Sequence, residues 1–309
     1  MALRTYFFSG IAALGLGFFM ISCNNGKAIK EEPAETTQKG NISITVDESF
    51  KPVIEQELKV FDSSFPDATI RVQYKPENQC IEDLFKDSAR LILTTRDLST
   101  QEKETMKSNG IKIKSLPVAM DAIAVIVHPN SPDSLMTLGQ LRTVLQGTFS
   151  RPYTIVFDNQ QSGTVRYMMD SLIPGQKLSS KSYAVKDNAS VIKYVTENEN
   201  SLGIVGVSHV YDPEDSDING VGKFRKGIRV VSLMDDSTGK FYEPYQAYIA
   251  LKKYPLRRSL YFVSRESWQG LGTGFINFLC SEPGQLIFSK ARLVPLRVQL
   301  RIREAEIKP

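Results

Sequence analysis

The chain has 309 residues, of which 41% are hydrophobic and 23% charged, a composition typical of a folded protein with two domains or lobes. Its formal net charge is only +4, and it contains no long run of lysine and arginine and no aromatic-basic stripe, so nucleic-acid binding is not expected. The two histidines, His128 and His209, are far apart in the sequence and no Cys-x-x-Cys pair occurs, so we expect neither a metal site nor a cofactor.

Residues 1–23 have the features of an export signal. Arg4 precedes an apolar run that begins at Tyr6 and ends in the letters MISC, which place Cys23 at its end. The run is shorter than the roughly 20 residues that a membrane-spanning helix needs, although an uncleaved anchor remains an alternative. The run with its cysteine resembles the lipobox of bacterial lipoproteins, which implies that Cys23 is lipidated. We therefore expect an exported protein with a lipid anchor in a bacterial membrane, facing the periplasm or the cell exterior.

Residues 24–40 are polar and lack aromatic side chains, which predicts a flexible tether. The sequence then alternates between strand and helix patterns. A strand is expected near 42–46 and a helix over 50–61, and further strands near 70–74 and 90–95. The helix over 50–61 is expected to bury one apolar face, formed by Phe50, Val53, Ile54, Leu58 and Phe61.

Two helices carry a capping box at their N-termini, Ser99 with Glu102 and Thr137 with Gln140, and Gly147 is expected to end the second. Apolar strands are expected over 121–129, 153–158 and 202–207, with helices between them. The polar stretch 211–227 is predicted to be a surface excursion. Apolar strands that alternate with helices predict α/β architecture with mainly parallel sheets. Cys80 and Cys280 follow the signal, and the sequence leaves their pairing open.

The letters SGT at Ser162, Gly163 and Thr164 follow a predicted strand and open a predicted helix. In open α/β sheets, ligands lie at such strand ends, and Gly163 would let the backbone approach an anion closely. The alternatives are a nucleophile at Ser162 or a simple helix cap. Neither G-x-S-x-G nor G-x-x-x-x-G-K-[ST] occurs, which argues against the nucleophile, and these residues alone do not distinguish cap from anion site.

Two further loops have the same character. Thr94, Thr95 and Arg96 follow an apolar strand and precede a capped helix, and Ser49 opens the first long helix. Hydroxyls and a guanidinium are the groups that hold an anion by neutral donors and one positive charge. Together, the three loops favour a binding cleft.

Several segments between residues 42 and 296 carry a resemblance to the PstS-like phosphate-binding lipoproteins of ABC transporters, within the periplasmic solute-binding class. The letters SGT are similar to that family's phosphate loop, and TTRDLSTQE resembles its loop after an earlier strand. MDAIAVIVHPNSP with TLGQLRTVLQG resembles its hinge strand and following helix, and SLGIVGV its next Gly-rich strand. YPLRRSLYFVS resembles a second hinge segment, and FINFLCSEPGQLIFSKARLVPL resembles its C-terminal helix and exit.

The resemblance implies a two-lobed periplasmic-binding-protein fold of type II, in which each lobe is a mainly parallel sheet flanked by helices and two strands form the hinge. Residues 41–124 plus 247–309 would form one lobe and residues 125–246 the other. It implies capture of an inorganic oxyanion, above all phosphate, between the lobes for delivery to an ABC transporter permease. The protein would be a monomer and not an enzyme. The implied ligand-binding residues are Ser162, Gly163, Thr164, Arg166, Thr94, Thr95, Arg96 and Ser49.

The sequence departs from the family pattern at three places. The first loop reads Asp47-Glu48-Ser49 where the family has a cluster of small Gly, Ser and Thr residues. Asp158 lies where the family has an arginine that clamps phosphate, and Thr95 where it has an aspartate that accepts a phosphate proton. Arg96 and Arg166 would supply the missing charge, and Asp47 or Glu48 the missing acceptor. Two other functions stay open: a ligand-free sensor or assembly protein, and a phosphoester hydrolase or transferase on the same fold.

Overall fold

The computed structural model of this chain describes residues 35–212, 214 and 222–296. The predicted signal with its Cys23, most of the predicted tether and the centre of the excursion at 211–227 lie outside these ranges. No helix within the described ranges has the length and apolar character needed to cross a membrane.

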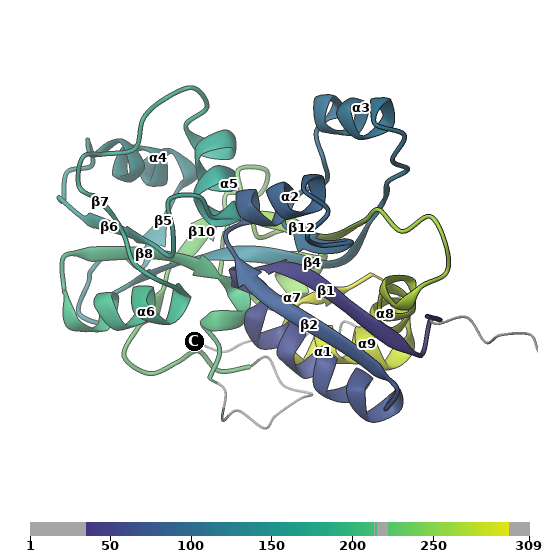
Figure 1. The fold of residues 1–309 in the computed structure, drawn as a ribbon. Helices are drawn as coiled ribbons and strands as arrows, with labels where there is room; N and C mark the ends of the chain where they lie inside the picture. The colour runs from purple at the N-terminus through teal and green to yellow at the C-terminus, as the bar shows by residue number, and fades with distance from the viewer. Residues whose placement is uncertain (1–34, 213, 215–221, 297–309) are drawn as a thin grey trace, which may run out of the picture. The chain divides into compact units, whose positions relative to one another are not determined.

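The first half of the fold is a sheet with the strand order β2-β1-β3-β12-β4. In it β1 pairs in parallel with β3 and with β2, and β1 and β2 lie side by side in Figure 1. Separate apolar clusters line its two faces. One contains Phe61 and Phe275 from helices α1 and α8, and the other contains Cys80 and Met106 from α2 and α3. The elements are β1 (Gly40–Asp47), the 3-10 helix η1 (Glu48–Phe50), α1 (Lys51–Ser64), β2 (Ala68–Lys75), α2 (Glu77–Phe85), β3 (Leu91–Thr94), α3 (Thr100–Ser108), β12 (Arg257–Ser264), α8 (Leu271–Cys280), α9 (Glu282–Lys290) and β13 (Val294–Pro295).

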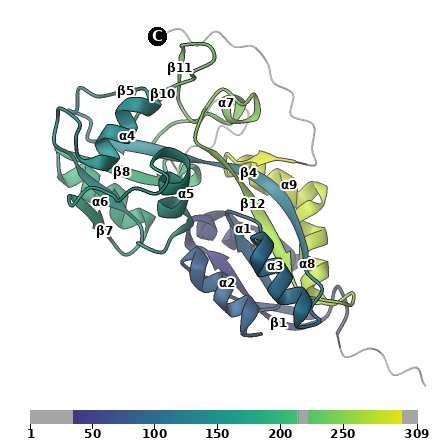
Figure 2. The same cartoon turned by 90° about the horizontal axis from the view of Figure 1, so that it is seen from above.

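The second half begins along the long strand β4 (Lys114–Val127), which continues out of the first half and pairs with β8 (Figure 2). The order is β4-β8-β6-β7, and β6 pairs in parallel with both of its neighbours. The remaining elements are β5 (Leu135–Met136), α4 (Leu138–Gln146), β6 (Thr154–Phe157), α5 (Gly163–Leu172), β7 (Ser182–Ala184), α6 (Asn188–Glu197), β8 (Ser201–Gly206), the 3-10 helix η2 (Val207–His209), β9 (Arg229–Val230), β10 (Ser232–Met234), β11 (Phe241–Tyr242) and α7 (Gln246–Ala250).

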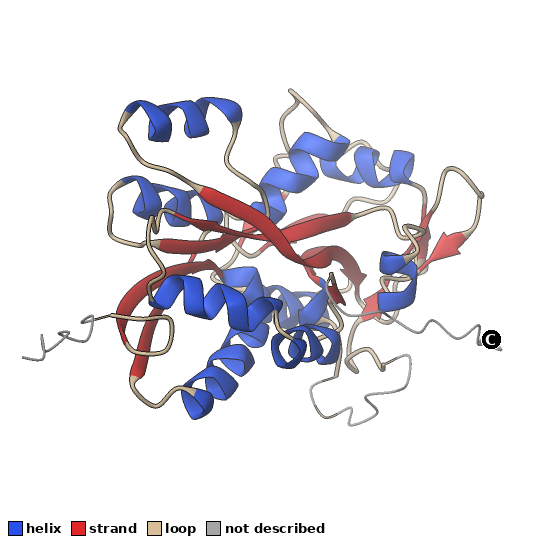
Figure 3. Cartoon of the chain, turned by 90° about the vertical axis from the view of Figure 1, so that its right-hand side faces the viewer, coloured by secondary structure: helices blue, strands red, loops and turns tan. Residues whose placement is uncertain are grey.

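The predicted α/β architecture is confirmed, and helices lie on both sides of the strands (Figure 3). The parallel pairing holds for the outer strands of each half. The pairs that β4 makes with β12 and β8 are antiparallel, as is the pair of β12 with β3. β4 carries the chain from the first half into the second, and β12 carries it back in the opposite direction. β3 is buried on both faces: Leu91 and Leu93 join one apolar cluster and Ile92 joins the other. This explains why its sequence is apolar throughout.

The predicted helix boundaries are confirmed where capping residues defined them. Ser99 and Glu102 form a reciprocal capping box at α3, as do Thr137 and Gln140 at α4. Gly147 ends α4 with a φ of 75°, a left-handed conformation that glycine adopts without strain. Each hydrogen bond satisfies a backbone group that the helix itself leaves without a partner.

The described end of the predicted tether contacts the folded body. The Glu35 carboxylate accepts hydrogen bonds from Arg90 Nη2 at 2.9 Å and from the backbone N–H of Leu271 at 3.0 Å. This contact ties residue 35 to the N-terminus of α8.

Cys80 and Cys280, whose pairing the sequence leaves open, lie in α2 and α8, and no disulfide joins them. Burial raises the pKa of the Cys80 thiol above its ordinary value. Cys80 therefore acts as a small apolar residue of the core.

Candidate functional site

The three loops singled out in the sequence meet at Gly163, the first residue of α5. A Cβ atom placed on Gly163 would lie 2.5 Å from Thr95 Oγ1 and 2.8 Å from Asp47 Oδ2. Thr95 follows β3 and Asp47 ends β1, so strand ends from the first half meet a helix start from the second. Only glycine permits this approach, because any side chain would collide with both neighbours.

Ser162 is the N-cap of α5. Its hydroxyl accepts a hydrogen bond from the backbone N–H of Val165 at 3.2 Å. The carboxylate of Asp158 lies nearby: burial raises the pKa of Asp158, and hydrogen bonds from Ser162 and the Asn159 backbone oppose that rise. The cap that was one alternative for this residue is thus present, and a ligand role for Ser162 stays a prediction.

Arg258 brings a positive charge to this place from β12. Its Nε donates to Asp121 Oδ2 at 2.7 Å, and the two residues are direct cross-strand partners on β12 and β4. Its Nη1 lies 3.3 Å from the hydroxyl of Thr164, which is fully buried. Burial opposes the charge, but the Asp121 and Asp47 carboxylates outweigh it and raise the pKa of Arg258. The guanidinium is therefore a permanent charge held in the interior.

Three buried polar atoms near Arg258 have no hydrogen-bond partner among the described residues: Arg258 Nη2, Ser49 Oγ and Asp47 Oδ2. They surround the start of α5 and the end of β8. A Cβ atom on Gly206 would lie 3.5 Å from Arg258 Nη2 and 3.7 Å from Ser49 Cβ. Buried polar groups are normally satisfied, so a guanidinium, a hydroxyl and a carboxylate oxygen in this state indicate a place for a polar ligand.

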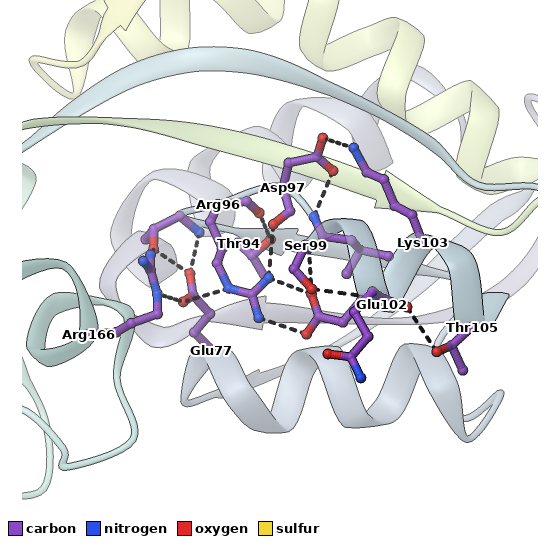
Figure 4. Close-up of polar contacts among 12 residues, drawn as sticks. Glu77, Thr94, Arg96, Asp97, Ser99, Glu102, Lys103, Thr105 and Arg166 are labelled. Carbon is purple, nitrogen blue, oxygen red and sulfur yellow. Dashed lines mark hydrogen bonds and ion pairs between the residues drawn. The ribbon is translucent and has the colours of Figure 1, made fainter. Parts of the chain in front are cut away.

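Thr95 and Arg166 already share a partner, the fully buried carboxylate of Glu77 (Figure 4). Glu77 Oε2 accepts from the backbone N–H of Thr95 at 2.8 Å and from the Thr95 hydroxyl. Glu77 Oε1 accepts from Arg166 Nε at 2.5 Å. Arg166 Nη2 also donates to the Thr95 hydroxyl at 3.0 Å, so the three side chains form one closed network.

The side chains of Thr94 and Arg96 form hydrogen bonds within the segment 94–102. The Arg96 guanidinium forms two hydrogen bonds with the Glu102 carboxylate, at 2.7 Å and 2.9 Å (Figure 4). The Thr94 hydroxyl donates to the Arg96 carbonyl at 2.9 Å. Hydrogen bonding to Arg96 lowers the pKa of Glu102 to about 2, so this ion pair persists across the physiological range.

A second polar group lies on the side of α6. The side-chain amide of Asn188 donates to Glu48 at 3.0 Å and to Asp158 at 3.2 Å. His209 Nε2 donates to the carbonyl of Ser49 at 2.9 Å, and burial lowers the pKa of His209 to about 4. Burial raises the pKa of Glu48 to about 7, with repulsion from Asp158 adding to the effect. Among the described residues, no three His, Cys, Asp or Glu side chains are grouped in a way that suits a metal.

A cleft of about 520 Å³ opens beside these groups and reaches Asp47, Ser162 and His209. Its lining carries both signs of charge, with four basic residues, Lys51, Lys75, Lys186 and Arg225, and five acidic ones, Asp47, Glu48, Glu55, Asp158 and Asp187. The charges of this lining therefore do not by themselves favour the approach of an anion.

The sequence analysis missed two residues of the site, Glu77 and Arg258. Arg258 had a detectable signal in the sequence, because it alternates in phase with Leu260 and Phe262, which lie on the buried side of β12. Glu77 had none, since an acidic first residue of a helix is ordinarily explained by the helix dipole.

Comparison with known proteins agrees with this fold. Residues 31–283 match the family model described as the PBP superfamily domain. The chain is 20% identical to the phosphate-binding protein PstS of Pseudomonas aeruginosa over 96% of this chain and 95% of that protein. It is also 20% identical to PstS of Staphylococcus aureus, over 92% and 86%.

Solved structures show the same fold. A protein from Clostridium perfringens, described as a phosphate ABC transporter substrate-binding protein and solved with bound phosphate, superposes with a TM-score of 0.70 at 23% identity. That match covers 83% of this chain and 100% of the other. An ABC-type phosphate transport receptor from Vibrio cholerae gives 0.64 at 17% identity, over 82% and 99%.

Both the fold and the position of the site define a two-lobed α/β solute-binding protein. The chain belongs to the PBP superfamily, and the predicted resemblance to PstS-like proteins is confirmed.

Proposed function

We propose that this protein captures an inorganic oxyanion outside the cytoplasm, with phosphate as the first ligand to test, and delivers it to an ABC transporter permease. One observation carries the proposal: the Arg258 guanidinium is buried at the start of α5, and neither its Nη2 nor the nearby hydroxyl of Ser49 has a hydrogen-bond partner within the described part of the chain. An anion at this point would satisfy both donors and meet the favourable end of the α5 dipole.

The ligand site in this proposal consists of Ser49, Gly163, Thr164 and Arg258, with the carboxyl group of Asp47 beside them. Arg258 supplies the guanidinium that the family places at the position occupied here by Asp158. Relatives whose names state phosphate binding align over nearly the whole chain, which supports phosphate over other oxyanions. Binding would require no covalent step, so the function is that of a transport protein rather than an enzyme.

The two lobes of this proposal follow the apolar clusters. The apolar cluster that contains Phe61 and Phe275 joins α1, α8 and α9 to the first half of the sheet. A second cluster joins α4, α5 and α6 to the second half of the sheet. Tyr254 and Leu256 belong to the second cluster, so we place the return crossing near Arg257 rather than at 247. With that change, the lobes are residues 41–124 plus 257–309 and residues 125–256, which would close over the ligand.

Export, lipidation at Cys23 and a monomeric state complete the proposal. Export and lipidation rest on the signal pattern of residues 1–23, which lie outside the described ranges, and the monomeric state rests on the resemblance to PstS-like proteins. Replacing Cys23 by Ser is expected to move the protein from the membrane fraction to the soluble extracytoplasmic fraction, because a lipid anchor would be lost.

Calorimetric titration of the full-length chain in detergent with phosphate, sulfate and molybdate tests the ligand. Arg258→Lys keeps the charge beside Asp121 but removes the planar donor fork. We expect it to weaken phosphate binding at least about tenfold, because a hydrogen bond to a charged group contributes about 1.5–3 kcal/mol. Arg257→Lys is the matched control, since Arg257 is the neighbour of Arg258 on β12 and its Nε donates to the Tyr254 carbonyl at 3.0 Å. Equal affinity in both variants, or no phosphate binding in the wild type, would contradict the proposal.

A further inference from the structure

The carboxylate of Glu77 is itself an anion held by the donors that the sequence analysis assigned to the ligand. It takes the backbone N–H and hydroxyl of Thr95 and the Nε of Arg166, and it lies 3.8 Å from Arg96 Nε. A neutral donor pair with one or two guanidinium groups is the coordination that an oxyanion prefers. The carboxylate of Glu77, a side chain of the protein itself, thus occupies the donors that a bound oxyanion would need.

The position of Glu77 is not explained by helix stability alone. As the first residue of α2, it would favour the helix dipole equally well from an exposed position. Instead it is fully buried, and one of its partners, Arg166, lies 89 residues away in α5. Burying a carboxylate is costly unless a specific partner compensates, so this pair links two elements that the ligand must also contact.

The network leaves a second set of polar atoms without partners. Arg258 Nη2, Ser49 Oγ and Asp47 Oδ2 are buried and unpartnered, whereas the donors of Thr95 and Arg166 that face the cluster are taken. Glu77 Oε2 would lie 3.0 Å, and Asp47 Oδ2 2.8 Å, from a Cβ on Gly163, so the carboxylate borders the same point as the unpartnered acceptor. The candidate site therefore has an open part and a part that the chain fills itself.

We propose that Glu77 is a built-in competitor of the ligand, a counter-anion that occupies the Thr95–Arg166 donors until the captured oxyanion displaces it. This inference rests on the proposed function. The oxyanion first meets Arg258, Ser49 and Thr164, and it gains Thr95 and Arg166 only when Glu77 withdraws. Glu77 therefore lowers the affinity for the ligand, and the site is complete only after its carboxylate has left Thr95 and Arg166.

Phosphate titration of the full-length chain in detergent tests the competition. Glu77→Gln keeps the size of the side chain and removes its charge, so we expect phosphate to bind on the order of tenfold tighter or more, because a like charge near the ligand is lost. Adding Arg166→Met to Glu77→Gln is expected to abolish that gain, since the released donor is gone. Glu266→Gln is the matched control: Glu266 is also a buried carboxylate with backbone and hydroxyl donors, but it lies at α8. We expect it to leave phosphate affinity unchanged.

The outcomes separate this inference from the function on which it rests. Phosphate binding in the wild type with no gain in Glu77→Gln would make Glu77 a structural residue and leave the proposed function standing. No phosphate binding in any variant would overturn both.

Glu77→Ala gives a readout without phosphate: formate should occupy the released donors and raise the melting temperature of this variant, but not that of the wild type. If Glu77→Gln fails to fold, Glu77→Asp, whose shorter side chain withdraws the charge from Arg166, should bind phosphate with intermediate affinity. Equal stability of Glu77→Ala with and without formate would contradict the inference.

Discussion

Glu77 and Glu266 are both fully buried carboxylates near the start of a helix, but their hydrogen bonds come from different distances along the chain. Glu266 accepts from the backbone N–H of Gly272 at 3.0 Å and of Thr273 at 2.7 Å, only six and seven residues away. Glu77 accepts from Thr95, 18 residues away, and from Arg166, 89 residues away.

The difference separates a structural carboxylate from one placed to respond to a ligand. Glu266 satisfies the orphan N–H groups at the start of α8, and its contact from further along the chain, Arg90 at 3.8 Å, lies in the same half of the fold. Glu77 depends on α5 remaining beside α2 and β3. In a protein whose lobes close over a ligand, contacts of the second kind change with the ligand and contacts of the first kind do not.

The largest expected effect comes from removing the local carboxylate. Glu266→Ala leaves the N–H groups of Gly272 and Thr273 without an acceptor in the interior, so the free energy of unfolding should fall by about 2–4 kcal/mol. Glu77→Ala should lose less, because its removal also relieves repulsion with Asp47. Urea unfolding of both variants measures the difference. A larger loss in Glu77→Ala than in Glu266→Ala would reverse the comparison.

Glu57 extends the comparison to a buried carboxyl group that has no hydrogen-bond partner among the described residues. Burial raises the pKa of Glu57 from 4.5 to about 9, so the folded protein keeps it protonated at neutral pH while the unfolded chain ionises it. Ionisation of Glu57 therefore stabilises only the unfolded chain, and the free energy of unfolding falls as pH rises from 4.5 to about 9. Glu57→Leu should raise the free energy of unfolding by about 1–3 kcal/mol at pH 8 and by less at pH 5.

Chemical denaturation of Glu57→Leu at both pH values measures this gain. Glu55→Leu is the control, since Glu55 lies on the same helix and its side chain is half exposed. A gain of the same size at pH 5 and pH 8 would mean that packing, and not the proton, causes the effect.

Replacing Asp47 tests how charge at the ligand site affects phosphate affinity, with a smaller expected effect than the preceding variants. Burial, with repulsion from Glu77 and Asp158, raises the pKa of Asp47 to about 7, although Arg258 opposes the rise. Because an anion prefers the neutral form of Asp47, binding should take up a proton near this pKa. Asp47→Asn should therefore strengthen phosphate binding at pH 8 by up to about tenfold and change it little at pH 6.

Calorimetry at both pH values, compared between wild type and Asp47→Asn, isolates this effect from the titration of phosphate itself. Glu48→Gln is the control, because the pKa of Glu48 is also raised to about 7 while its hydrogen bonds go to Asn188. If Asp47→Asn weakens binding at pH 8, the ionised carboxylate accepts a ligand proton there and attraction outweighs repulsion.

Local patterns predicted the parts of this fold that depend on neighbours in the sequence. The capping boxes of Ser99 and Thr137 and the end of α4 at Gly147 follow from hydrogen bonds within a few residues. The closeness of the loops after β1 and β3 was also predictable, because the carboxyl ends of parallel strands share one edge of a sheet. Their meeting with Gly163 depends in addition on how the second half faces the first.

The partners of Glu77 and Arg258 were not predictable in the same way. Arg166 contacts Glu77 across 89 residues, and Arg258 contacts Asp121 across 137. Which arginine remains available to a ligand depends on which acid captures each one, and that competition is decided only in the folded structure. Arg166 and Arg96 were assigned to the ligand on their position, and both are bonded to the chain's own carboxylates.

Ser162 gives the smallest expected effect and decides what the SGT stretch does. Its hydroxyl caps α5 through the N–H of Val165 at 3.2 Å, so Ser162→Ala should lower the free energy of unfolding by about 1 kcal/mol. If capping is its whole role, phosphate affinity should change far less than in Arg258→Lys, because a cap positions the helix start without using its hydroxyl on the ligand. Urea unfolding and calorimetric titration of Ser162→Ala and Ser162→Asp, in which the carboxylate can still cap, separate the two roles. Stability restored in Ser162→Asp together with lost phosphate binding would show that a negative charge is not tolerated beside the ligand, and it would place Ser162 within contact of the anion as well as at the start of the helix.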